Sequence, residues 1–226
     1  MITCAVIPCY NEAATIGEIV TKSLHHVDKV VVADNMSQDA TIAEAERSGA
    51  IVCCCSVRGA GAATRRGIRR SLVLGADAIV LLDGDGQHDP DEIPQLLSPI
   101  LSRDADIACG VRTVNGNATP AYRRIGLSVI SAAYNVGSRK PWQHDVLSGF
   151  RAINRDAASN LLITDTWYGF SAEMLMKARL AGYRIVDVPV TCIYHKNVKD
   201  NSTINPVVHG VRVLLSVIMW RVRCGY

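Results

Sequence analysis

Residues 78–88 read AIVLLDGDGQH, an apolar run that ends in two aspartates separated by one glycine. The apolar part has the length of a buried strand, and the turn residues after it mark the strand's end. Side chains alternate faces on an extended chain, so Asp83 and Asp85 point the same way. Like charges this close are unfavourable unless a partner compensates them, and a divalent cation is the usual partner. The stretch predicts a metal site at a strand end, with a turn of two solvated aspartates as the alternative.

Apolar runs alternate with helix-like stretches through the first half of the chain. The strand-like runs lie near 2–8, 29–34, 50–55, 78–83 and 105–111, and the helix-like stretches near 12–25, 39–48, 60–74 and 90–102. Continuous apolar strands separated by helices indicate βαβ units and a parallel sheet covered on both faces.

The second half is less regular. It contains helix-like stretches near 122–138, 155–162, 171–181 and 205–226, and strand-like runs near 149–154 and 184–194. We therefore predict an α/β protein: one Rossmann-like domain with a mostly parallel central sheet flanked by helices, followed by an amphipathic C-terminal helix.

In open α/β sheets, ligands bind beyond the carboxyl ends of the strands. Four predicted strand ends carry polar groups, namely Asn11-Glu12, Asp34-Asn35, Arg58-Gly59 and residues 83–87. Their convergence predicts a single site. Near it, Tyr10 could stack on a nucleobase, Glu12 could accept a hydrogen bond from a ribose hydroxyl, and Asp34 could accept one from a base N–H.

The composition fits one large domain of 226 residues, with 49% hydrophobic and 20% charged residues. The eight cysteines lie largely in strand-like runs without CxxC spacing, so we expect reduced thiols in an intracellular protein. The first eight residues predict a strand and not a signal peptide. The glycine-rich stretch 58–64 (RGAGAAT) lacks the third glycine of GxGxxG, and GKS and GKT are absent from the sequence, which excludes a dinucleotide fingerprint and a Walker loop.

Charge is unevenly distributed, with a net charge of −6 in residues 1–111 and +9 in residues 112–226. The basic half could meet a phosphate-bearing partner, a membrane surface or nucleic acid, or it could be a solvated face. In the last helix-like stretch, the apolar-or-small run 213–220 is too short to span a membrane. Its flanking arginines and Trp220 favour an interfacial amphipathic helix, and packing onto the domain or a dimer contact is the alternative.

Taken together, the motifs resemble the GT-A glycosyltransferases of family 2, and within them the dolichyl-phosphate mannose synthase-like branch. The matching segments are residues 8–12 (PCYNE), Asp34 with 37–41 (SQDAT), 83–88 (DGDGQH), Arg123-Arg124, 147–151 (LSGFR) and 169–173 (GFSAE). Residues 202–210 are similar to archaeal-type dolichyl-phosphate sugar synthases in particular. The resemblance spans essentially the whole chain, and the ordered set is far more specific than any one member.

The resemblance implies a GT-A fold and a role for each matching residue. The nucleotide would contact Pro8, Tyr10, Glu12, Asp34, Asp83 and Gly84. Catalytic roles would fall to Asp83, Asp85, Arg123 and Arg124, and Asp85 with Gln87 would bind Mg²⁺ or Mn²⁺. Basic and polar groups suited to the acceptor phosphate are Arg112, Arg151, Ser148 and His195.

The implied reaction is an inverting transfer of a hexose or N-acetylhexosamine from a nucleotide sugar, with a UDP-sugar favoured, to a polyprenyl (dolichyl) phosphate. It would serve protein N-glycosylation or surface glycan assembly. The alternatives are a GDP-mannose-dependent dolichyl-phosphate mannose synthase and a family 2 transferase acting on a sugar hydroxyl. We expect residues 1–204 to be catalytic, with 1–111 binding the donor and 112–204 the acceptor, and residues 205–226 to form the terminal helix. The expected location is the cytoplasmic face of a membrane, bound peripherally, with a homo-oligomer or a membrane subunit as possible partners.

Three other classes fit less well. A nucleotidyltransferase would place a glycine-rich basic loop after the first strand, where this chain has PCYNE at residues 8–12. A nucleic-acid-binding module would interleave aromatic and basic residues, but the chain has only two Phe. A degenerate, non-catalytic relative is disfavoured because Asp83, Asp85 and Gln87 are all intact.

Overall fold

The computed structural model describes residues 1–112, 121–136, 143–193 and 206–223. Within these ranges, seven strands form one sheet in the order β3-β2-β1-β4-β6-β5-β7. Their bounds are β1 (Thr3–Cys9), β2 (Lys29–Asp34), β3 (Ile51–Cys54), β4 (Ala78–Leu81), β5 (Ile107–Arg112), β6 (Arg151–Asn154) and β7 (Ile185–Val190).

All of these strands except β6 run in one direction. The pairs β1–β2, β1–β4, β2–β3 and β5–β7 are parallel, and β6 lies antiparallel between β4 and β5. The prediction of a mostly parallel sheet is confirmed. Because β6 is reversed, its first residue, Arg151, pairs with Leu81 near the carboxyl end of β4. The segment just before β6 therefore lies next to the aspartates just after β4.

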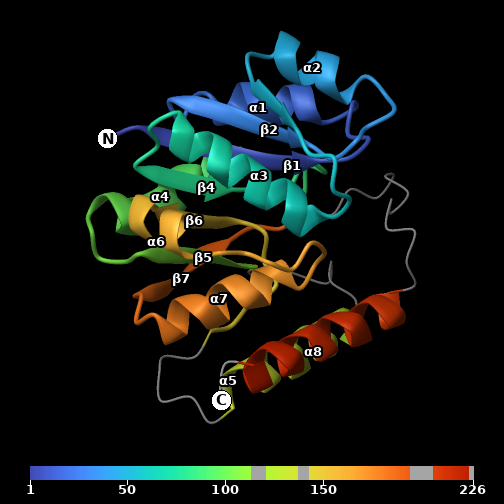
Figure 1. The fold of residues 1–226 in the computed structure, drawn as a ribbon, viewed down its shortest axis with the longest axis vertical. Helices are drawn as coiled ribbons and strands as arrows, with labels where there is room; N and C mark the ends of the chain where they lie inside the picture. Colours follow the sequence, from blue (N-terminus) through green and yellow to red (C-terminus); the bar gives the residue numbers. More distant parts are fainter. Residues whose placement is uncertain (113–120, 137–142, 194–205, 224–226) are drawn as a thin grey trace.

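Helices cover both faces of the sheet (Figure 1). They are α1 (Ile16–Ser23), α2 (Thr41–Arg47), α3 (Ala60–Val73), α4 (Ile93–Leu101), α5 (Ala121–Asn135), α6 (Arg155–Asn160), α7 (Phe170–Leu180) and α8 (Pro206–Arg223), with a 3-10 turn, η1 (Pro90–Glu92), before α4. The alternation of side chains divides the core in two. In β1, Cys4 and Val6 pack with α3 and α7, whereas Ala5 and Ile7 pack with α1 and α4.

The first helix begins later than the sequence pattern predicts. We expected it from residue 12, but α1 begins at Ile16. The backbone of Asn11 is left-handed, with φ of 57°, and its side-chain oxygen accepts the N–H of Gln38 at 2.8 Å. Asn tolerates this conformation better than most residues do. The delayed start leaves Glu12 in the turn that follows β1, at the edge of the sheet.

The last helix, α8, packs against α5 and α7 (Figure 1). Val217 and Trp220 are buried in that contact, and the Arg221 guanidinium donates to two backbone carbonyls at the end of α5. The other side of α8 leaves apolar side chains exposed, namely Val211, Leu215, Ile218, Met219 and Val222. The helix thus has both a packed face and an exposed apolar face. Among the described residues, we find no helix long and apolar enough to cross a membrane.

Candidate active site

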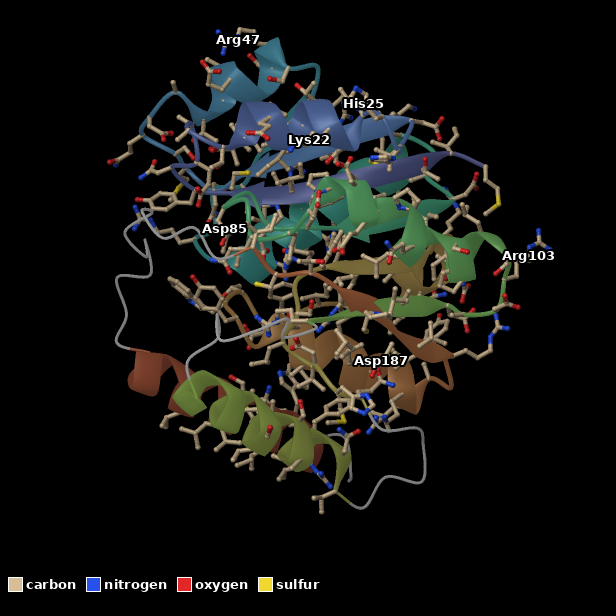
Figure 2. The ribbon with its side chains drawn as sticks, turned by 180° about the vertical axis from the view of Figure 1, so that it is seen from behind. Lys22, His25, Arg47, Asp85, Arg103 and Asp187 are labelled. Atoms are coloured by element: carbon tan, nitrogen blue, oxygen red, sulfur yellow. The ribbon has the colours of Figure 1, made fainter. Side chains whose placement is uncertain are left out.

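Polar side chains gather at the carboxyl ends of β1, β2 and β4, where the sequence predicted a site. These strands are adjacent and parallel, so the residues that follow them meet at one edge of the sheet. Figure 2 shows Asp85 at this edge and Arg103, which precedes β5, at the opposite one. The prediction that the strand ends converge is confirmed for Glu12, Asp34, Asp83 and Asp85.

The stretch after β4 folds back on itself through its own polar groups. The N–H of Asp83 donates to Nδ1 of His88 at 3.1 Å, and Oδ1 of Asp85 accepts the N–H of Gln87 at 2.9 Å. Gly86 lies in the turn with φ of 76°, a conformation that glycine adopts without strain. The turn thus commits one carboxylate oxygen of Asp85 to the backbone of its own loop.

His88 supports this turn as a neutral group. Burial lowers the pKa of His88 to about 4, against the opposing effect of Asp85. The ring is stacked on Phe150, with centroids 5.0 Å apart. Nδ1 is also 3.7 Å from the Asp83 carboxylate. Because the ring is neutral near pH 7 and Nδ1 accepts the Asp83 N–H, this approach is not an ion pair.

Two glycines allow the backbone to approach Asp83 and Glu12 closely. A Cβ at Gly149 would lie 2.7 Å from a carboxylate oxygen of Asp83, and a Cβ at Gly84 would lie 2.7 Å from Sγ of Cys9. The carbonyl of Gly84 accepts a hydrogen bond from Thr15 Oγ1 at 2.6 Å. The segment that precedes β6 therefore lies close to Asp83, and the segment that follows β4 lies close to the end of β1.

Each of the three carboxylates is harder to ionise than it would be in water. Burial and the neighbouring Asp85, Asp39 and Asp83 raise the pKa of Glu12 to about 7. Burial, then Asp83, raise the pKa of Asp85. Burial also raises the pKa of Asp83, although Arg112 and Arg151 oppose the shift. Because the Asp83 side chain is 47% exposed, solvent screens part of this effect.

The donor set suits a hard cation held only in part by protein. Carboxylate and amide oxygens of Asp85 and Gln87 are ligands that Mg²⁺ and Mn²⁺ accept. The pKa values of Glu12 and Asp85 are raised first by burial and then by neighbouring carboxylates, and a cation would oppose both effects. In the part of the chain that the structure describes, no three His, Cys, Asp or Glu groups form a ready-made metal cluster. A cation here would therefore take much of its coordination shell from water and a ligand. The residues fit such an ion.

Asp34 offers a single buried acceptor. One of its carboxylate oxygens accepts the N–H groups of Met36 and Ser37, at 3.0 and 3.1 Å. The other oxygen is buried and has no hydrogen-bond partner among the described residues. An unpaired buried acceptor is costly, so an N–H donor from a ligand would relieve it. Nearby, Tyr10 is 42% exposed and Arg58 lies 5.5 Å from its ring centroid.

Asn35 joins the end of β2 to the next loop, a role that its position alone did not reveal. Its side-chain nitrogen donates to the carbonyl of Val57 at 2.7 Å, and its oxygen accepts the N–H of Gly59 at 2.7 Å. Pro8 lies within β1, where it pairs with Ala33, and its carbonyl approaches Gly84.

The residues predicted to bind an acceptor phosphate lie in different environments. Arg112 forms a two-bond pair with Asp145, at 2.6 and 2.9 Å. Arg151 is buried, and its guanidinium donates to the carbonyls of Ser171 and Val146, both at 2.7 Å. Ser148 is also buried. Through these contacts, Arg151 joins the first turn of α7 to the segment that precedes β6.

The structure does not describe the side chains of three predicted site residues. The backbone of Arg123 and Arg124 belongs to α5, but their side chains lie outside the described part of the structure, as does the whole of His195. Their roles remain predictions.

The chain belongs to Glycosyl transferase family 2, whose sequence profile matches residues 4–162. It is 30% identical to an uncharacterized protein of Methanocaldococcus jannaschii, over 96% of this chain and 91% of that one. It is 30% identical to polyprenol monophosphomannose synthase of Mycolicibacterium smegmatis (84% and 76% covered). It is 27% identical to UDP-N-acetylglucosamine–dolichyl-phosphate N-acetylglucosaminyltransferase of Methanococcus voltae (95% and 94% covered).

Among solved structures, the fold matches glucosyl-3-phosphoglycerate synthase from Mycobacterium tuberculosis in complex with Mn²⁺ and UDP-glucose. The TM-score is 0.77 at 23% identity, covering 99% of this chain and 79% of that one. The predicted GT-A fold is confirmed, and the protein is a glycosyltransferase.

The raised pKa of Glu12 predicts how stability depends on pH. Its folded-state value of about 7 exceeds its ordinary value of 4.5, so stability falls as pH rises through that interval. Glu12→Gln should therefore melt a few degrees above the wild type at about pH 8, and the difference should shrink towards about pH 5. Thermal unfolding at both pH values measures this. As a control, Glu46→Gln on the exposed surface of α2 should show no such pH dependence. A Glu12→Gln variant that melts no higher than the wild type at the higher pH would contradict the assignment.

Proposed function

We propose that the protein transfers a hexose or N-acetylhexosamine from a UDP-sugar to a polyprenyl phosphate, with inversion at the anomeric carbon. The observation that carries this proposal is the cluster of Glu12, Asp83 and Asp85 beside the unpaired buried oxygen of Asp34. The cluster suits a diphosphate held through a cation, and the Asp34 oxygen suits a nucleobase. The names of the mycobacterial and methanococcal relatives support a polyprenyl phosphate acceptor.

The single free oxygen of Asp34 favours uracil. Uracil presents one ring N–H, whereas guanine presents a ring N–H and an amino group side by side, which a carboxylate matches best with two free oxygens. One Asp34 oxygen is already committed to two backbone N–H groups. A UDP-sugar therefore satisfies the site with one hydrogen bond. With a GDP-sugar, one of the two adjacent N–H groups of guanine would lack Asp34 as its hydrogen-bond partner. GDP-mannose is therefore the less favoured, alternative sugar donor.

The donor diphosphate would lie against Asp85 and Gln87, which would hold Mg²⁺ or Mn²⁺. That cation would stabilise the charge that develops on the leaving diphosphate. Asp83 would accept hydrogen bonds from the donor, and Glu12, which can hold a proton near neutral pH, would contact the ribose. Pro8, Tyr10 and Gly84 would complete the nucleotide contacts.

In the transfer step, an oxygen of the acceptor phosphate attacks the anomeric carbon and forms a new C–O bond. The bond from that carbon to the diphosphate oxygen breaks, and its electron pair leaves with UDP. A phosphate is already anionic near neutral pH, so the attack requires no general base. Attack from the face opposite the leaving group inverts the configuration, and correct alignment supplies much of the rate. Arg112, Arg123, Arg124 and His195 are the candidates for holding the acceptor phosphate.

The exposed face of α8 supports contact with a membrane. Val211, Leu215, Ile218 and Val222 recur every three or four residues and form an apolar stripe. Arg223 lies near this stripe, beside the ring of Trp220. Exposed apolar side chains beside an arginine suit the interface of an anionic bilayer. In this proposal residues 1–111 bind the donor, 112–204 bind the acceptor, and 205–226 contact the membrane from the cytoplasmic side.

A hydroxyl acceptor is the second candidate, because the structural neighbour acts as a glucosyl-3-phosphoglycerate synthase. That neighbour has only 23% sequence identity to this chain, so the likeness concerns the fold. The apolar stripe on α8 favours a lipid.

A transfer assay tests the proposed reaction. Purified protein with Mg²⁺ or Mn²⁺ receives labelled UDP-glucose, UDP-GlcNAc or GDP-mannose, with polyprenyl phosphate or 3-phosphoglycerate as acceptor. We expect label in the lipid phase from a UDP-sugar only when metal is present. Asp85→Asn should reduce transfer by about 10²–10³-fold without unfolding, because charge stabilisation at the leaving group is lost. The surface variant Asp91→Asn is the matched control. Full activity of Asp85→Asn, or transfer only to 3-phosphoglycerate, would contradict the proposal.

Membrane contact through α8 is tested by co-sedimentation with vesicles of phosphatidylcholine and phosphatidylglycerol. Leu215→Glu places a charge in the middle of the stripe and should weaken vesicle binding by about tenfold or more, since burying one Leu contributes about 1.5–3 kcal/mol. Val73→Glu is the control, because Val73 is also apolar and exposed but lies on α3. If both variants bind like the wild type, α8 does not contact the bilayer.

A further inference from the structure

Two adjacent aromatic side chains lie exposed on the segment between α6 and α7. Trp167 is 54% exposed and Tyr168 is 45% exposed, although only 5% of the chain is aromatic. Large aromatic side chains that are exposed to solvent are a common feature of binding surfaces. The roles assigned above from sequence do not involve either residue.

The segment that carries them is held rigidly from below. The carboxylate of Glu173, fully buried on α7, accepts the N–H groups of Thr164 and Asp165, at 2.8 and 2.7 Å, and the hydroxyl of Thr164 at 2.7 Å. Lys177 balances its charge at 2.6 Å. The Asp165 side chain then accepts the N–H of Trp167 at 2.7 Å. The backbone that carries the exposed aromatic pair is therefore held in place before any ligand binds, which lowers the entropic cost of binding.

The same segment lies between the nucleotide side of the protein and α8. On one side, the carbonyl of Thr166 accepts the N–H of Ala62 at the start of α3, at 3.2 Å (Figure 1). A Cβ at Gly59 would lie 1.9 Å from that carbonyl oxygen and 3.5 Å from the Trp167 ring. On the other side, a Cβ at Gly169 would lie 3.0 Å from the Ser216 side chain of α8. Trp167 and Tyr168 thus stand where the donor half meets the helix with the apolar stripe.

Tyr168 is also within electrostatic reach of the carboxylates. Burial, then the charges of Asp83 and Asp85, raise the pKa of its phenol. The hydroxyl therefore remains protonated and able to donate a hydrogen bond. A neutral donor is well suited to this position, because a lysine or arginine would pair with the carboxylates directly.

We propose that Trp167 and Tyr168 form part of the acceptor subsite: the Tyr168 hydroxyl positions the acceptor phosphate next to the anomeric carbon, and the Trp167 ring packs against the prenyl chain beyond its first unit. This inference rests on the proposed function. The pair combines an apolar ring with one neutral donor, between the carboxylates and the apolar stripe of α8, and this combination matches a phosphate joined to a hydrocarbon chain. A small phosphorylated metabolite would use the hydroxyl but not the ring.

Steady-state kinetics of Tyr168→Phe test the positioning role. Loss of one hydrogen bond to a charged group should raise KM for polyprenyl phosphate about tenfold or more, while KM for the UDP-sugar and the affinity for UDP stay within about twofold. If Tyr168 had only a structural role, KM for the UDP-sugar and the affinity for UDP would change as well. An unchanged acceptor KM, or a rise in donor KM instead, would overturn the proposal.

Chain length tests the role of Trp167. Trp167→Ala should raise KM more for a long polyprenyl phosphate than for a five-carbon prenyl phosphate, and Trp167→Phe should restore most of the loss. Leu162→Ala is the matched control, because Leu162 is an exposed apolar residue of the same segment and should leave both values unchanged. An equal effect on both acceptors would overturn the role of the ring. Failure of the wild type to use any polyprenyl phosphate would be a failure of the proposed function itself, and this outcome is distinct from an active wild type with insensitive variants.

Discussion

The burial of carboxylates close together at the edge of a parallel sheet is the constraint on which the site depends. Adjacent parallel strands deliver Glu12, Asp83 and Asp85 to one place, and each carboxylate there has a raised pKa. The fold maintains this arrangement through the β4 turn, the neutral ring of His88 and the absence of a side chain at Gly149. In the proposed function, a cation and the donor diphosphate would compensate the buried negative charge, so the electrostatics of the site and its proposed function have the same origin.

The donor side was largely predictable from sequence because its determinants are local. Apolar runs, turn residues and polar residues at strand ends fixed the parallel strands and the convergence of Glu12, Asp34 and Asp83. The late start of α1 was missed, because it depends on the left-handed backbone of Asn11 and a bond to Gln38 across the next loop. The chain order of strands also did not reveal that β6 is inserted in reverse between β4 and β5.

The proposed acceptor side was less predictable because its determinants are long-range. The sequence alone does not distinguish an exposed arginine that could bind phosphate from a buried one. Arg151 is buried, and its guanidinium donates to two backbone carbonyls. The role proposed for Trp167 and Tyr168 depends on two contacts that the sequence does not show. Glu173 accepts hydrogen bonds from the backbone of their segment, and the segment lies close to Gly59. In the proposed function, the surface that binds the lipid phosphate becomes less polar along its length. It runs from the carboxylates to the neutral hydroxyl of Tyr168, then to the Trp167 ring and the apolar stripe of α8.

The most direct test of this account is calorimetric titration of UDP into the protein with and without Mn²⁺. If the carboxylates are uncompensated until a cation and a diphosphate bind together, Mn²⁺ should tighten UDP binding by about tenfold or more, and UDP should tighten Mn²⁺ binding by the same factor. Equal affinity for UDP in the presence and absence of Mn²⁺ would contradict the account, because the carboxylate cluster would then have no part in holding the diphosphate.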